Sequence, residues 1–315
     1  MGNAMERICL FVTCTFKSFI GAALSISLQK YLILLLQTYT LNATFKIQTT
    51  DVVTADARLF IQISQQGITY WVIDNGNECV ALHTYHFAVE TNFEKAATNL
   101  KQLAVEEKML QENFKKVTII YAYPTVLLVP SEFLLEAAKK DMLELVHGDI
   151  TDVFIRTDFL YRHHMHNIYT VPKQLDAVVS YLFSSQVSTH QYSLLPDMFM
   201  DDGNHLHCIF GNHYFTVMLV KEGKLQAIQT FQFKTPEDVA YYLLQLCESF
   251  EVDVNDITLH LNGMIDSSSN LFTELNKYFL QLQFAALPGN FTYPEEIGKY
   301  PAHYFSHLFA AATCV

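Results

Sequence analysis

The sequence predicts an α/β protein made of two β-β-β-α-β halves in tandem, and three observations lead to this fold class. First, residues 58–87 align with residues 205–234 without a gap. Second, each copy contains three short apolar or β-branched runs separated by turn signals. Third, each copy is followed by a stretch of helical composition and then by a further β-type run. A repeat of this length predicts two similar domains, each with its own sheet.

The register between the two copies is set by matching residues. Thr69 corresponds to Thr216 and Gly76 to Gly223, and the offset is 147 residues in both cases. Apolar positions coincide along the same alignment. The repeat therefore extends over the whole strand trio, and the same topology is expected in both halves.

In the first copy, the apolar runs predict strands over residues 58–63, 68–73 and 79–87. Gly67 begins the turn between the first two strands. The "DNGN" segment at 74–77 is a strong hairpin signal, because Asn and Gly tolerate the positive φ angles that tight hairpin turns require.

The second copy repeats these elements with the turns "GNH" at 211–213 and "KEGK" at 221–224. The helix after it begins with Thr235 as the N-cap and Pro236 at the first helical position. The run "ITLHLNG" at 257–263 is the fourth strand of this half.

The remaining secondary structure follows from composition and period. Residues 91–112 predict the first-half helix, and 117–123 predict the strand after it. Residues 133–146 and 173–183 supply helices between the halves. The chain is expected to close with a helix from Glu295 to about Ala312.

Three segments are expected. Residues 1–41 form an apolar N-terminal extension, residues 42–200 the first half, and residues 201–315 the second half with a C-terminal helix that returns to the first. The extension is either an upstream segment with translation starting near Leu41, a signal peptide or a membrane anchor. Two lysines at positions 17 and 30 leave too short an apolar stretch for a stable membrane span.

Composition and charge exclude some classes of function. Half of the 315 residues are apolar, so the chain has enough material for a sizeable core. The 20 Lys and Arg face 32 Asp and Glu, and the net charge of -12 would repel phosphate backbones. Nucleic acid is therefore not an expected partner.

The six cysteines are scattered along the chain and form no pair of C-x-x-C motifs, so a structural zinc site of that kind is not expected. They are interpreted as reduced, mostly buried thiols. A reducing compartment follows, and the predicted location is cytoplasmic. If residues 1–41 are genuine, the alternative is a membrane-associated or exported protein.

Two further segments carry a resemblance to known proteins: "NIYTVPKQLDAVVSYLF" at 167–183 and "YPAHYFSHLF" at 300–309. With the duplicated strand-turn pattern, they make the chain resemble the actin-like (ribonuclease-H-like) ATPase fold, and within it the actin-like proteins of pilus assembly. More closely, the chain is similar to an uncharacterised Bacteroidetes family described only as a domain of unknown function. The resemblance covers roughly residues 42–315.

The resemblance implies where a nucleotide would bind, and this chain departs from the pattern there. Nucleotide-binding members carry an Asp-x-Gly element in the first turn of each half, where the Asp organises Mg²⁺ and the Gly admits phosphate. Here Ser64 and Gly211 take the Asp places. The degenerate nucleotide-loop positions are Ser64, Gln65, Gln66, Gly67, Gly211, Asn212, His213 and Gly263. Without the carboxylates, hydrolysis of ATP by the family mechanism is not expected, and neither a catalytic residue nor a cofactor is assigned.

A histidine cluster in "YRHHMH", at 161–166, raises the possibility of a metal site. On a strand, His164 and His166 would share one face as two weak candidate ligands, with no neighbouring carboxylate. The alternative, which the turn-like context favours, is an exposed hairpin tip. The segment "DDGNHLH" at 201–207 is interpreted as a turn rather than a weak cation site.

Three functions remain after these exclusions. The first is a non-catalytic actin-like protein that serves as a protein-interaction or assembly module, with an unidentified protein partner. The second is an ATP-binding protein that uses altered phosphate loops. The third is a metal-dependent activity at the His163–His166 cluster.

Overall fold

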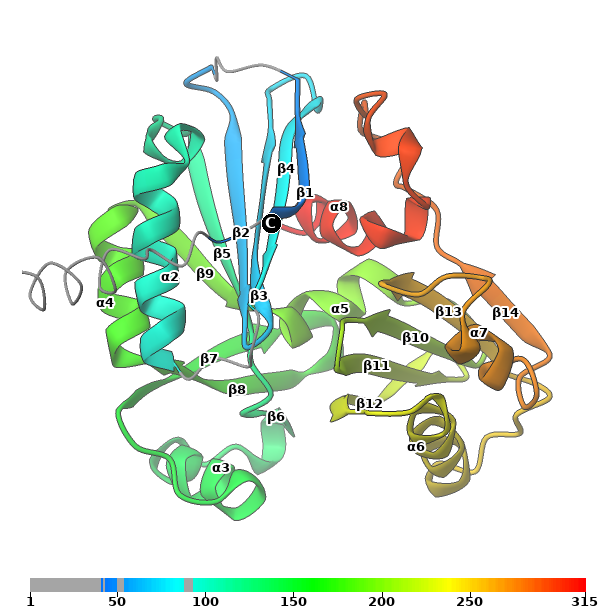
Figure 1. Cartoon of the computed structure of the whole chain (residues 1–315). Coiled ribbons are helices and arrows are strands. Elements are labelled where there is room, and N and C mark those ends of the chain that lie inside the picture. The colour runs from blue at the N-terminus through cyan, green and yellow to red at the C-terminus, as the bar shows by residue number, and fades with distance from the viewer. Residues whose placement is uncertain (1–40, 42, 50–53, 88–92) are drawn as a thin grey trace, which may run out of the picture. The chain divides into compact units, whose positions relative to one another are not determined.

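The computed structural model describes residues 41, 43–49, 54–87 and 93–315. The predicted N-terminal extension lies outside the described residues, apart from Leu41. Within residues 43–315 the strands form three sheets, two of which correspond to the two predicted halves (Figure 1).

The first sheet contains six strands in the order β1-β4-β3-β2-β5-β9. β5 and β9 run parallel to β2, and the other neighbours are antiparallel. α2 (Phe93–Glu106) connects β4 to β5 and packs against α4 (Lys173–Leu182), which precedes β9. The strands are β1 (Ala43–Gln48), β2 (Arg58–Ser64), β3 (Gly67–Ile73), β4 (Cys79–His86), β5 (Lys116–Ala122) and β9 (Gln186–His190).

The second sheet contains five strands in the order β12-β11-β10-β13-β14. α6 (Pro236–Ser249) connects β12 to β13, and α7 (Asn270–Leu275) connects β13 to β14. β13 runs parallel to β10, as β5 does to β2. The strands are β10 (His205–Phe210), β11 (Tyr214–Lys221), β12 (Lys224–Gln232), β13 (Thr258–Gly263) and β14 (Gln281–Phe284).

The two sheets therefore have the same strand order, with β1 added at the edge of the first. This confirms the predicted duplicated β-β-β-α-β fold class. Local signals explain the agreement: Glu222 and Gly223 both have positive φ, 52° and 69°, as a two-residue hairpin turn requires. Thr235 and Asp238 form the capping box that starts α6.

A third, three-stranded sheet in the order β6-β8-β7 is inserted between β5 and β9, and of this sheet only the hairpin tip at 161–166, between β7 and β8, was predicted. Its strands are β6 (Val126–Pro130), β7 (Val153–Leu160) and β8 (Met165–Pro172). The helix predicted over 133–146 is shorter, because two 3₁₀ turns (Ser131–Phe133 and Glu136–Ala138) precede α3 (Lys139–His147). Leu143 of α3 packs with Val129 and Ile168 of this inserted sheet.

The prediction that the closing helix begins at Glu295 is also wrong. α8 (Ser306–Thr313) begins later, after 3₁₀ turns at Ile297–Lys299 and Ala302–Tyr304. The cause is Pro301, which lacks an N–H and disfavours helical backbone at the residue before it. Tyr300 accordingly has extended angles, φ -118° and ψ 155°.

The C-terminal segment completes the core of the first sheet. Phe305, Leu308 and Phe309 pack with Phe60 and Trp71, on the face that α2 and α4 do not cover (Figure 1). Covering both faces explains why the central strands are buried almost continuously rather than in alternation. None of the helices in the part of the chain that the structure describes has the length and apolar character needed to cross a bilayer.

Candidate functional site

The first turns of the two halves meet at the ends of β2 and β10, although 146 residues separate them along the chain. The side-chain Oε1 of Gln66 accepts a hydrogen bond from the backbone N–H of Asn212, at 3.2 Å. Gly211 leaves room for this contact, because a Cβ atom at Gly211 would lie 2.3 Å from the same Gln66 oxygen. The two turns therefore touch directly through the Gln66 side chain.

A cavity of about 140 Å³ lies between these turns. Sites for drug-sized ligands usually enclose about 300–1,000 Å³, so the cavity is too small for a nucleoside triphosphate in this conformation. The C-terminal segment also lines it, through Tyr304, Phe305, His307 and Leu308. The Gln66 side chain and this segment therefore both form walls of the cavity.

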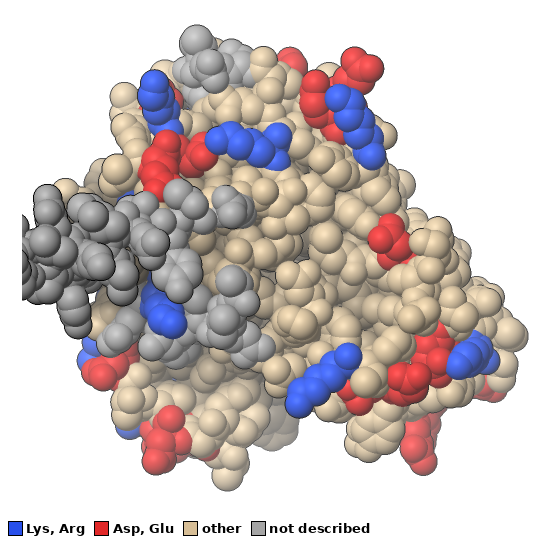
Figure 2. Space-filling model, in the orientation of Figure 1, with Lys and Arg blue, Asp and Glu red and all other residues tan. Residues whose placement is uncertain are grey.

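The cavity is also electrically neutral. Among the described residues that line it there is no Asp, Glu, Lys or Arg. Burial lowers the pKa of His86 below its usual value and that of His307 to about 4, so both imidazoles are uncharged at neutral pH. Figure 2 shows that, on the face drawn there, most of the acidic and basic side chains lie towards the margins.

Ser64, at the position where the resemblance predicts a metal-organising Asp, is hydrogen-bonded within its own turn. Its Oγ accepts hydrogen bonds from the backbone N–H groups of Gln66 and Gly67, both at 3.2 Å. It also lies 3.3 Å from the Gly67 carbonyl oxygen, to which it donates. The hydroxyl thus satisfies the backbone of the turn, as short polar side chains commonly do.

Two of the glycines have structural reasons for being glycine. A Cβ atom at Gly67 would lie 2.2 Å from the carbonyl oxygen of Tyr85 in the neighbouring strand. Gly263 has a φ of 78°, and a Cβ there would lie 2.3 Å from the carbonyl oxygen of Phe210. Close backbone approach accounts for both residues, so neither by itself indicates a phosphate site.

The structure brings most of the predicted loop positions together. Ser64, Gln65, Gln66, Gly67, Gly211 and Gly263 line the cavity. Asn212 and His213 are not among its lining residues; both are exposed, and Asn212 takes part through its backbone N–H.

The polar side chains that the second sheet and α5 (Gln191–Phe199) place at the cavity were not predicted from the sequence. Thr230 Oγ1 lies 2.9 Å from Thr216 Oγ1 and 2.9 Å from the hydroxyl of Tyr192, which links β11, β12 and α5 beside the cavity. Nothing in the local sequence signals this contact, because it depends on how α5 crosses the second sheet.

The weak metal candidates His164 and His166 lie in the β7–β8 hairpin. His164 occupies the turn in a left-handed conformation, with φ 51°, and is exposed. His166 lies on β8, where its ring stacks on Phe159 with centroids 4.7 Å apart. They are not part of a group of three potential ligands within the described residues.

A different set of histidines does lie together: His205, His207 and His260, with ring nitrogens within 4.8 Å of one another. Residues 201–204 form the loop before β10, whereas His205 and His207 lie on β10 itself. The His-x-His alternation was visible in the sequence. The contribution of His260 was not predicted, because only the parallel pairing of β10 with β13 brings this residue next to His207.

The fold and the family match known proteins. The family model described as "Protein of unknown function (DUF3822)" matches residues 44–282. No curated protein matches the chain.

Among solved structures, the chain is similar to a protein of unknown function with an actin-like ATPase fold from Bacteroides thetaiotaomicron. The TM-score is 0.69 at 19% identity, over 83% of this chain and 97% of that one. It is also similar to the PilM–PilN type IV pilus biogenesis complex, with a TM-score of 0.55 at 12% identity, over 82% of this chain and 98% of that one. These likenesses confirm the actin-like fold and the predicted resemblance.

Proposed function

The chain belongs to the DUF3822 family of proteins of unknown function, and we propose that it is a non-catalytic actin-like protein that acts by binding another protein. The observation that carries this proposal is the small, neutral cavity where the fold would place a nucleotide. The described residues that line it include no carboxylate to hold Mg²⁺ and no Lys or Arg to compensate a triphosphate.

The alternative is ATP binding through the altered loops. It would require the cavity of about 140 Å³ to widen, for example by Gln66 leaving Asn212, since Gln66 and the C-terminal segment both line the cleft. It would also require phosphate to bind through neutral donors alone, without the charge compensation that makes phosphate sites strong. The observed cleft therefore favours the non-catalytic function.

Titration with Mg-ATP tests this proposal. The unmodified protein is expected to show no heat of binding, with a Kd weaker than about 1 mM, which corresponds to about 4 kcal/mol. The same preparation is expected to release no phosphate from ATP. A magnesium-dependent Kd in the low micromolar range would overturn the proposal and establish the alternative.

A matched variant strengthens the test by restoring the missing carboxylates. Ser64→Asp with Gly211→Asp is expected to recover weak magnesium binding, since two carboxylates then face the cleft. The new side chain at position 211 would displace the flexible end of Gln66 and would lie 3.3 Å from the backbone carbonyl oxygen of Tyr214, which has to shift slightly. Calorimetry with MgCl₂ alone measures this recovery against the unmodified protein.

The distribution of exposed apolar side chains supports protein binding. Half of the large hydrophobic residues that are exposed in the described chain fall within the segment that forms the inserted sheet, α3 and the turns between them: Phe133, Leu135, Leu145, Val146, Phe154, Phe159 and Tyr161. Single exposed apolar residues are common, but seven of them in one inserted segment favour this segment as the place where a partner binds. A neighbour of the same fold is part of the PilM–PilN complex, which agrees with an assembly role.

The scattered thiols, of which Cys79, Cys208 and Cys247 are buried and free, support a cytoplasmic location.

Substitution of two of these residues tests the surface. Phe133→Ser with Leu145→Ser is expected to reduce by at least about tenfold the amount of a specific protein that co-purifies with the tagged full chain, because a hot-spot side chain contributes more than about 1.4 kcal/mol. Quantitative mass spectrometry of the co-purified proteins measures this. Tyr241→Ser, which alters an exposed ring of α6, is the control and should leave the partner in place. An unchanged set of partners in the double variant would remove the inserted sheet from the proposal.

A further inference from the structure

Three imidazoles gather on one face of the second sheet, away from the turns that form the cleft. His205 and His207 are two residues apart on β10, so their side chains share a face. His260 pairs directly with His207 in the parallel neighbour β13. One ring nitrogen from each lies within 4.8 Å of the others.

The hydrogen bonds of His205 fix its tautomer. Its Nε2 lies 2.7 Å from the carbonyl oxygen of Asp202, which can only accept, so Nε2 carries the proton. In the neutral ring, Nδ1 then presents a lone pair, and it lies 3.0 Å from Nε2 of His260. Metal-bound histidines usually have this arrangement, in which the second nitrogen donates to a carbonyl or carboxylate and orients the ring.

His207 supplies an independent observation. The residue is only 4% exposed, and its Nε2 is buried without a hydrogen-bond partner among the described residues. The ring lies between Phe199 of α5 and His260, nearly parallel to both, with centroids 5.1 Å and 4.4 Å away. A buried polar atom left unpaired is unfavourable, and such exceptions call for a ligand or ion.

We propose that His205, His207 and His260 bind a divalent transition metal of the Zn²⁺ class. Neutral imidazole suits Zn²⁺ and its neighbours, whereas Mg²⁺ and Ca²⁺ prefer oxygen ligands. Zn–N bonds of about 2.0–2.1 Å in a tetrahedral site put the ligand nitrogens about 3.3 Å apart. The His205–His260 pair is already close to this separation, and the parallel His207 and His260 rings need to turn so that their nitrogens converge.

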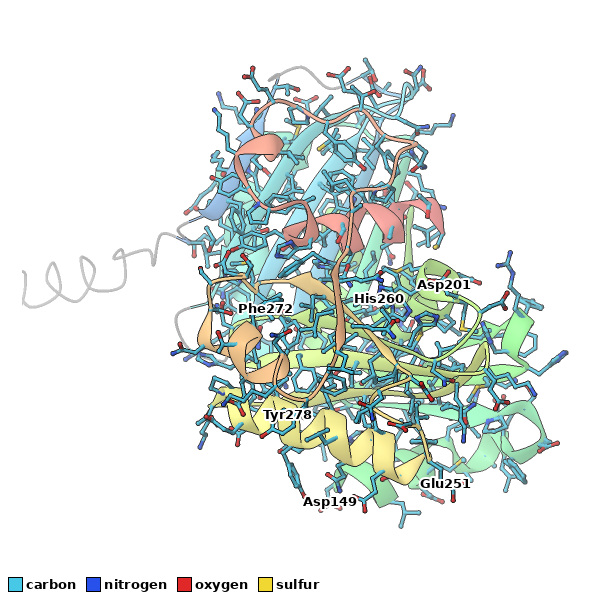
Figure 3. The ribbon with its side chains drawn as sticks, turned by 90° about the vertical axis from the view of Figure 1, so that its right-hand side faces the viewer. Asp149, Asp201, Glu251, His260, Phe272 and Tyr278 are labelled. Carbon is cyan, nitrogen blue, oxygen red and sulfur yellow. The ribbon has the colours of Figure 1, made fainter. Side chains whose placement is uncertain are left out.

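The surroundings offer a fourth ligand. Asp201, in the loop before β10, is labelled near His260 in Figure 3, although its carboxylate is not among the atoms that lie within 4.8 Å of one another. Its carboxylate or a water molecule would complete the shell. The metal would then tie together β10, β13 and the 201–204 loop, and it would do so independently of nucleotide or partner binding.

The test uses the full chain after treatment with a chelator. Zn²⁺ titration against a chromophoric competitor is expected to show one site per chain, and Zn²⁺ is expected to raise the Tm. His205→Gln and His260→Gln should each weaken Zn²⁺ binding by at least about 100-fold, since each removes a ligand rather than its outer partner. The control is His164→Gln with His166→Gln, which alters histidines outside the cluster and should leave the affinity unchanged.

Co²⁺ bound to the unmodified protein provides a second readout that does not depend on the folding of any variant. Intense visible d–d absorption, expected for a four- or five-coordinate site and displaced by Zn²⁺, supports the proposal. The weak absorption of octahedral Co²⁺, the absence of a one-to-one site, or equal Zn²⁺ affinity in folded His260→Gln and unmodified protein would each overturn it.

Discussion

Gly263→Ala is expected to lower the free energy of unfolding by about 3 kcal/mol or more, because two unfavourable effects act at one position. The φ of 78° lies in the left-handed region, which costs a residue with a Cβ about 1–2 kcal/mol. The new Cβ would also lie 2.3 Å from the carbonyl oxygen and 2.9 Å from the nitrogen of Phe210. Both are backbone atoms of β10 that cannot move without disturbing the sheet, and overpacking of this kind costs about 1–3 kcal/mol.

Urea-induced unfolding measures this effect. Gly298→Ala is a matched control, because no atom lies within 4 Å of its Cβ position and its φ is not in the left-handed region. The control should change the free energy of unfolding by less than about 1 kcal/mol. Equal urea midpoints for the two variants would show that the turn after β13 adapts, and that Gly263 is not required by its backbone.

Acid is expected to destabilise the protein between pH 6.5 and 4 through buried histidines, and His190 should contribute about 3 kcal/mol over this range. Burial lowers the pKa of His190 to about 4 from an unfolded value of about 6.5. The unfolded state therefore binds more protons between these values, and stability is full above pH 6.5 and is lost as the pH falls. His83 and His307, with pKa values also lowered to about 4, act in the same direction.

The hydrogen bonds of His190 explain why its charged form is excluded. The residue is 1% exposed, and its Nε2 lies 3.0 Å from the carbonyl oxygen of Tyr123, to which it donates. Nδ1 accepts from the backbone N–H of Tyr192 at the start of α5. A second proton on Nδ1 would face that N–H, so protonation breaks the N-cap.

Urea midpoints at pH 7.5 and 5.0 test this prediction. His190→Gln should be less stable at pH 7.5 but should lose less stability on acidification. His164→Gln, at an exposed position, should keep the full pH dependence of the unmodified protein. A pH dependence that survives unchanged in His190→Gln would assign the acid sensitivity to other groups.

The strand trios were predictable from sequence because their signals are local. The "KEGK" turn and the Thr235 cap act within a few residues, and the first copy has its own hairpin signal, "DNGN", at the place that corresponds to "KEGK". The inserted sheet was not predicted as a sheet, because β6 pairs with β8, some forty residues further along the chain, and no local pattern encodes that pairing. α8 starts later than predicted because Pro301 disfavours helical backbone at Tyr300, although the composition around both residues is helical.

The candidate site, too, has a part that was predictable from the sequence and a part that was not. The resemblance predicted most of the loop residues that line the cleft, since strand ends of related halves occupy related places, but Asn212 and His213 are not among the lining residues. The contact between Gln66 and Asn212 could not be predicted, because it depends on how the two halves pack. His260 lies 55 residues from His205, and only the parallel pairing of β10 with β13 brings them together.

The packing of the C-terminal segment on the first sheet has a consequence for biosynthesis. Phe60 and Trp71 are translated more than 230 residues before Phe305 and Phe309, which cover them in the folded protein. A nascent chain that already contains the whole first sheet therefore still exposes one apolar face until Phe305 and Phe309 have been made. Such a face favours misassembly or the recruitment of chaperones during that interval. The first sheet therefore cannot be fully covered before the second sheet has been translated, because the residues that cover it follow the second sheet in the chain.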